Sequence, residues 1–87
     1  MIKGQTQTGF DYEINEGRLD NYELLEAISD VDKNPLKVIT VVQLLLGTKQ
    51  SERLKDHVRD EEGVVSAVRM NDEITDILSA SSATKNS

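Results

Sequence analysis

The sequence has no cysteine and no tryptophan, and it has a single proline in 87 residues. Without cysteine the chain can form no disulfide, no thiolate nucleophile and no cysteine-based zinc site. Its aromatic residues are Phe10, Tyr12 and Tyr22, so the core must be largely aliphatic. The aromatic platforms on which proteins stack single-stranded nucleic acid are therefore missing.

Positive charge and long apolar runs are also scarce. Sixteen acidic residues against ten basic ones give a net charge of -6, the wrong sign for binding a phosphate backbone. No apolar stretch approaches the roughly 20 residues that span a bilayer, and we expect no signal peptide. The composition, 37% hydrophobic and 30% charged, is typical of a small globular domain. We therefore expect neither nucleic acid nor a membrane as a partner.

The first 17 residues have the pattern of extended structure. Phe10, Tyr12 and Ile14 alternate with acidic residues, a period of two that indicates a strand with one buried face. Residues 2–8 could pair with this strand as a hairpin that turns near Gly9. Because those residues carry few apolar side chains, a single strand is the alternative.

Two helices are predicted next. Asp20 and Glu23 have the spacing of a capping box at the start of the first, whose apolar stripe is formed by Leu24, Leu25, Ile28 and Val31. Asn34 as N-cap and Pro35 at the first helical position predict the second helix, over residues 35–46. Gly47 follows this helix and is predicted to be its left-handed cap.

Two further helices complete the predicted fold. Thr48 is expected to cap a helix that ends near Arg59, and an acidic turn over residues 60–63 separates it from the next. Ser66 can cap the last helix, which could restart near residue 71; its apolar positions are Ala67, Met70, Ile74, Ile77 and Leu78. The sequence thus predicts one mostly α domain of the α+β class over residues 1–78, comprising a strand or hairpin over 1–17 and about four short helices over 20–78. We expect the polar residues 79–87 to be a disordered tail.

Residues with catalytic or metal-binding chemistry are few. His57, the single histidine, could share a metal with Glu61 at i, i+4, but further ligands are lacking; the alternative is a surface histidine near a helix C-terminus. An EF-hand centred on Gly63 would place Val58 and Arg69 at positions that need carboxylates, which excludes that site. We predict no enzymatic activity, no cofactor, and no catalytic, cofactor-binding or metal-binding residue.

The most informative feature is the excess of apolar residues in the second helix. Eight of the residues from Leu36 to Leu46 are aliphatic, so this helix should be buried almost all round, which a domain this small can hardly achieve alone. Part of the helix is therefore predicted to contact another protein chain. The candidate interface residues, which lie on one side of the helix, are Val38, Val41, Val42 and Leu45. The alternative is a central core helix within one chain.

Several segments together resemble a known family. They are Tyr22–Ala27 (YELLEA), Asn34–Leu36 (NPL), Leu44–Gly47 (LLLG), His57–Gly63 (HVRDEEG) and Glu73–Leu78 (EITDIL). On these segments the chain resembles the small tail assembly chaperones of long-tailed (siphovirus-like) bacteriophages and prophages. The resemblance spans about residues 10–78, and residues 37–39 and the acidic turn match the family pattern best.

The resemblance implies an assembly factor without enzymatic activity that works in the host cytoplasm. Such chaperones coat the tape-measure protein, keep it soluble, help to recruit tail-tube subunits, and are absent from the mature virion. It implies no catalytic residues. A homo-oligomer is a further expectation. Two other functions stay open on the sequence: a small acidic adaptor or inhibitor of a basic or apolar partner, and a structural subunit of the head–tail connector.

Overall fold

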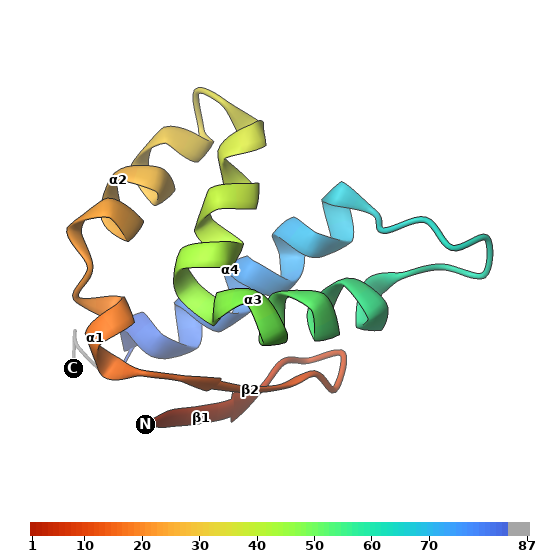
Figure 1. The fold of residues 1–87 in the computed structure, drawn as a ribbon, viewed down its shortest axis with the longest axis horizontal. Coiled ribbons are helices and arrows are strands. Elements are labelled where there is room, and N and C mark those ends of the chain that lie inside the picture. The colour runs from red at the N-terminus through yellow and green to blue at the C-terminus, as the bar shows by residue number, and fades with distance from the viewer. Residues whose placement is uncertain (84–87) are drawn as a thin grey trace.

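An antiparallel hairpin opens the computed structural model, which describes residues 1–83 (Figure 1). Strand β1 (Ile2–Gln5) pairs with β2 (Asp11–Ile14), with Ile2 opposite Ile14 and Gln5 opposite Asp11. The turn between them needs Gly9, whose φ of 92° is rarely adopted by residues with a side chain. The sequence-based prediction of a hairpin is thus confirmed, and the apolar positions of the second strand are buried as expected.

Two helices follow the hairpin. The single turn α1 (Glu16–Leu19) was not predicted; the Asn15 side chain caps it by accepting a hydrogen bond from the Gly17 N–H. Because α1 occupies these residues, Asp20 becomes its C-cap. Helix α2 (Tyr22–Val31) is capped instead by Asn21, whose side chain accepts from the Glu23 N–H at 2.9 Å. The predicted capping box at Asp20 is therefore wrong, since an equally good N-cap residue stands one position later.

The next helical segment starts and breaks where the sequence predicts. Asn34 accepts from the Leu36 N–H ahead of a 3₁₀ turn, η1 (Pro35–Lys37), which continues into α3 (Val38–Val58). Inside α3, Gly47 has φ 79° and ψ 174°, a conformation outside the helical region. Figure 1 shows the two halves of α3 running in different directions from this kink. The two halves correspond to the second and third predicted helices.

The kink at Gly47 is held by two side chains. Arg18 of α1 donates from Nη1 to the Leu44 carbonyl at 3.0 Å, and the Ser51 hydroxyl donates to the Gly47 carbonyl at 2.6 Å. Carbonyls at a helix end lack partners within the helix. The Arg18 bond therefore gives a partner to a carbonyl at the end of the first half and ties α1 to the middle of α3, while the Ser51 bond holds the start of the second half.

The last helix is longer than predicted. Ser66 caps α4 (Ala67–Ala83) by accepting from the Arg69 N–H at 3.2 Å, and no break occurs near residue 71. Residues 79–83, predicted to be disordered, are helical. Alanine and serine extend a helix that is already nucleated at little cost. The rest of the predicted tail, residues 84–87, lies outside the described residues.

One buried cluster joins the hairpin to the helices. It is aliphatic apart from two aromatic residues and one methionine, and it comprises Phe10, Tyr12, Ile14, Leu24, Ala27, Val41, Val42, Leu45, Leu46, Leu54, Val58, Met70, Ile74 and Ile77. The fold is thus α+β and mostly α, as predicted from the sequence. None of the helices in residues 1–83 is long and apolar enough to cross a membrane.

Candidate functional site

The four predicted interface residues lie toward the inside of this chain. Val41, Val42 and Leu45 are buried in the core, and Val38 is half-buried and packs against it. These residues share one side of α3, as predicted, but that side faces α2, the hairpin and α4. Val41, Val42 and Leu45 are therefore not accessible to another chain in this fold, and the placement of the four residues matches the alternative of a core helix.

Apolar side chains are instead exposed on the outer sides of the same helical segments. Leu36 of η1 and Ile39 of α3 are 73% and 63% exposed, and Tyr22 and Leu25 of α2 are 72% and 53% exposed. Leu24 and Ala27 are buried on the inner side of α2, and Leu25 lies on the outer side. The apolar stripe predicted for this helix, which included Leu25, is therefore narrower than expected. The sequence analysis did not identify Tyr22 and Leu25 as surface residues. The helical spacing of Leu24, Ala27 and Val31 was by itself enough to define the buried side of α2 without Leu25.

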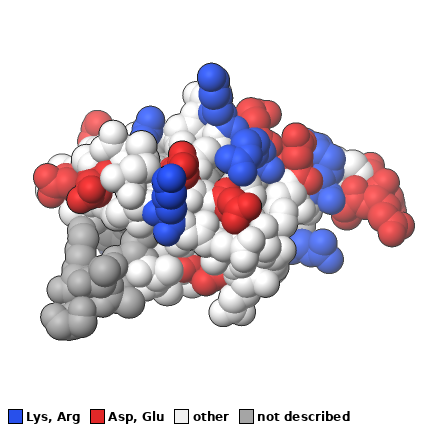
Figure 2. All heavy atoms as spheres, turned by 90° about the horizontal axis from the view of Figure 1, so that it is seen from below, with Lys and Arg blue, Asp and Glu red and all other residues white. Residues whose placement is uncertain are grey.

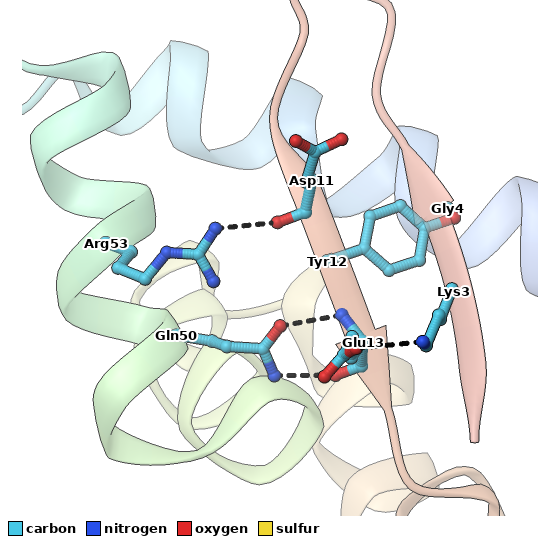
Figure 3. A pocket seen from close by; sticks show the side chains of 7 residues that line it. All are labelled: Lys3, Gly4, Asp11, Tyr12, Glu13, Gln50 and Arg53. Carbon is cyan, nitrogen blue, oxygen red and sulfur yellow. Dashed lines mark hydrogen bonds and ion pairs between the residues drawn. The ribbon is translucent and has the colours of Figure 1, made fainter.

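A hollow of about 500 Å³ lies between the hairpin and the second half of α3 (Figure 3). The Gln50 side chain accepts from the Glu13 N–H at 2.7 Å and donates to the Glu13 carbonyl at 2.6 Å, while Arg53 donates to the Asp11 carbonyl at 3.1 Å. These contacts satisfy the outer edge of β2, where another strand would otherwise pair. The polar groups of this hollow thus serve the fold.

The Tyr12 ring lies across Gly4 of β1 in the same hollow, and a side chain at Gly4 would overlap it. Burial, with a smaller contribution from the Asp76 carboxylate, raises the pKa of the Tyr12 phenol above its ordinary value of 10.0. The phenol therefore stays protonated near neutral pH and cannot act there as a base.

A buried carboxylate joins the hairpin turn to α4. Glu73 is 4% exposed and accepts hydrogen bonds from the Thr6 and Thr8 hydroxyls at 2.8 and 2.7 Å. Each hydroxyl has one hydrogen and gives it to Glu73, so the Thr8 oxygen is left to accept from His57 Nε2 at 2.9 Å. This network fixes the hairpin on the helices. Sequence reasoning missed it, although Glu73 lies between Met70 and Ile74 on the buried face of α4.

His57 matches the surface-histidine alternative. It is exposed in the last turn of α3, with its ring centroid 5.4 Å from that of Phe10. Since α3 ends at Val58, Glu61 lies in the following loop and the two do not share a helix face. Across the described residues, no group of three or more His, Asp or Glu side chains is placed to hold a metal ion.

Charge is mixed on the hairpin side of the molecule. Figure 2 shows Lys and Arg among Asp and Glu there, with acidic side chains gathered at one end. At that end the loop after α3 projects, carrying the exposed Asp60, Glu61 and Glu62. Asp60 holds the loop by accepting from the N–H groups of Glu62 and Val64, both at 2.9 Å. The predicted acidic turn is thus confirmed as a structured loop.

Comparison of the chain with models of protein families, with curated proteins and with solved structures found no significant match.

Proposed function

We propose that this chain is a tail assembly chaperone of long-tailed bacteriophages and prophages. In this role it binds the tape-measure protein in the host cytoplasm, keeps it soluble, helps to recruit tail-tube subunits, and leaves before the virion is complete. The proposal is supported by the resemblance over about residues 10–78 and by the apolar side chains exposed on α2, η1 and α3.

The exposed side chains carry the proposal. Single exposed apolar residues are common on protein surfaces. Here Tyr22, Leu25, Leu36 and Ile39 lie on the consecutive elements α2, η1 and α3, and the inner sides of α2 and α3 already fill the core. We name these four residues the outer apolar residues. Large apolar side chains on rigid helices are suited to covering the apolar stripe of a partner helix.

The expected strength of this binding is compatible with a chaperone that must dissociate from its partner. Burying the exposed parts of the four outer apolar residues would contribute about 4–8 kcal/mol. Association of two molecules costs about 4–15 kcal/mol in lost translational and rotational freedom. A single contact is therefore weak and reversible, and stable coating of a long partner requires many copies of the chain. The net charge of -6 would keep such an assembly soluble.

A tagged pull-down from cells that express the neighbouring phage genes tests the proposal, with the bound proteins identified by mass spectrometry. We expect recovery of a long tape-measure protein. Recovery of a compact toxin, enzyme or regulator would contradict the proposal and favour the adaptor function. Purified virions supply a second test, because a connector subunit remains in them whereas a chaperone does not.

A further inference from the structure

We infer that the outer side of α2 binds a basic amphipathic helix of the partner, with acidic side chains contacting its cations and Tyr22 and Leu25 contacting its apolar stripe. The inference rests on the proposed function for the identity of the partner, the tape-measure protein. The choice of this surface rests on the hollows, the charges and the exposed apolar side chains of α2.

Two hollows flank the same pair of acidic side chains on α2. One, of about 350 Å³, is lined by Tyr22, Leu25, Glu26, Ser29 and Asp30. The other, of about 340 Å³ and shared with α3, is lined by Glu23, Glu26, Ala27 and Asp30 of α2 and by Lys37, Thr40 and Leu44. Glu26 and Asp30, which line both hollows, are one helical turn apart, so they form a ridge between the hollows. The surface is therefore shaped for side chains on either side of two negative charges.

Within residues 1–83, the carboxylates of this surface form no ion pair, although Lys37 lines the hollow that they share with α3. Within the described residues, none of Glu23, Glu26 and Asp30 lies within 4.0 Å of a cationic group. Four acidic residues in the described part of the chain do form ion pairs, among them Glu52 with Lys55 at 2.8 Å and Asp56 with Arg59 at 3.3 Å. The acidic surface of α2 is thus left for a partner to neutralise.

The same charges work against the helix that carries them. Glu23 and Glu26 are spaced i, i+3 and Glu26 and Asp30 i, i+4, which places like charges side by side. The last turn of α2 contains no basic residue, and Asp30 stands near the negative end of the helix dipole. Local rules of helix design are typically broken where function requires it. We therefore attribute these charges to binding rather than to stability.

Charge complementarity and shape define the occupant. Carboxylates beside exposed Tyr22 and Leu25 match Lys or Arg beside an aliphatic stripe, and they repel an acidic partner. Residues 22–30 extend about 12 Å along the helix axis at 1.5 Å per residue. A partner helix with anchors at i, i+4 and i+8 covers this length. The second outer pair, Leu36 and Ile39, lines neither of the two hollows.

The first experiment uses a synthetic amphipathic helix with a leucine stripe flanked by lysines, and a matched peptide with glutamates in place of the lysines. Titration of the ¹⁵N-labelled chain followed by NMR should shift the resonances of residues 22–30 with the basic peptide and not with the acidic one. The double variant Glu26→Lys/Asp30→Lys should weaken binding by about tenfold or more. The control Glu61→Lys/Glu62→Lys changes the net charge equally and should bind as wild type.

Stability measurements separate loss of the surface from loss of the fold. The Glu26→Lys/Asp30→Lys variant makes the charges at positions 23 and 26 opposite, keeps one like-charge pair at positions 26 and 30, and adds a cation near the C-terminus of α2. Its thermal unfolding midpoint should therefore equal or exceed that of wild type. The pair Tyr22→Ser/Leu25→Ser should also lose the peptide, while Leu36→Ser/Ile39→Ser should retain it. Equal weakening by the loop control, or shifts located away from α2, would overturn the inference.

Co-expression with the tape-measure protein distinguishes failure of this inference from failure of the proposed function. If wild type and the Glu26→Lys/Asp30→Lys variant keep the tape-measure protein equally soluble, the inference is wrong and the proposed function stands. If wild type does not keep it soluble although the basic peptide binds at α2, the proposed function is wrong and the surface assignment stands.

Discussion

At the scale of single residues, the polar contacts of this protein join segments that are distant in the sequence. Glu73 of α4 binds two hydroxyls of the hairpin turn, Gln50 binds the backbone of β2, and Arg18 of α1 binds a carbonyl of α3. A two-stranded hairpin is marginal by itself. These contacts, together with the buried side chains of β2, therefore fix its position on the helices.

Glu73→Gln should lower the free energy of unfolding by about 1–3 kcal/mol, because the new amide group places buried donors where a carboxylate accepted from two hydroxyls. Urea denaturation measures the change. Asp72→Asn is the matched control: it removes the same charge one residue earlier on an exposed side chain, and its effect should stay within about 0.5 kcal/mol. Equal effects of the two substitutions would show that the buried network contributes nothing.

Tyr12 should make stability fall at alkaline pH. The folded chain raises the pKa of its phenol above 10.0, through burial and then Asp76, so the folded state holds this proton more tightly than the unfolded state. The resulting stabilisation is complete below pH 10 and is lost as the pH rises through the folded-state pKa. The free energy of unfolding, measured by denaturation at several pH values between about 8 and 11, should decrease less with pH for Tyr12→Phe than for wild type. Equal decreases for the two proteins would contradict this reasoning.

At the scale of secondary-structure elements, local features such as helix starts and breaks could be predicted from the sequence, and contacts between distant segments could not. The Asn34–Pro35 start and the Gly47 break depend on backbone conformations that few residues adopt, so the residue types reveal them directly. The side of residues 38–46 that faces the core was harder to predict, because nearly every side of this helix is apolar and periodicity alone cannot distinguish core from surface. Glu73 was missed because an acidic residue on an apolar face indicates a buried network only when its partners are known.

Leu45→Ala and Ile39→Ala separate the inner from the outer side of α3. Leu45 is fully buried, so its truncation should cost about 2–5 kcal/mol of unfolding free energy. Ile39 is mostly exposed, and its truncation should cost less than about 1 kcal/mol. Chemical denaturation of the isolated chain provides both values. A large loss at Ile39 with little loss at Leu45 would mean that the helix is rotated relative to this structure.

Gly47→Ala should test the kink. With φ 79° and ψ 174°, Gly47 occupies a region that is accessible almost exclusively to glycine, and a residue with a side chain there costs about 1–3 kcal/mol. Arg18 also lies 3.0 Å from where a Cβ would stand. Thermal unfolding measures the loss, and Gln43→Ala on the exposed side of the same helix is the control. A variant at least as stable as wild type would mean that α3 can run straight through residue 47.

At the scale of the whole molecule, core and surface divide the same helices between two tasks. The inner sides of α2 and α3 bury Leu24, Val41 and Leu45 to stabilise the chain, while the outer sides leave large apolar residues and unpaired carboxylates exposed. Burial of the whole core cluster contributes far more than the weak net contact expected of the outer residues. In the proposed function, the chain would therefore release a partner without unfolding.

The most direct test of this account measures how much tape-measure protein remains soluble when it is co-expressed with this chain. We compare wild type with a variant in which the four outer apolar residues, Tyr22, Leu25, Leu36 and Ile39, are changed to serine, after thermal unfolding has shown that the variant folds. The account predicts soluble tape-measure protein with wild type and its loss to the insoluble fraction with the variant. Equal solubility with the two proteins, or none with wild type, would contradict it.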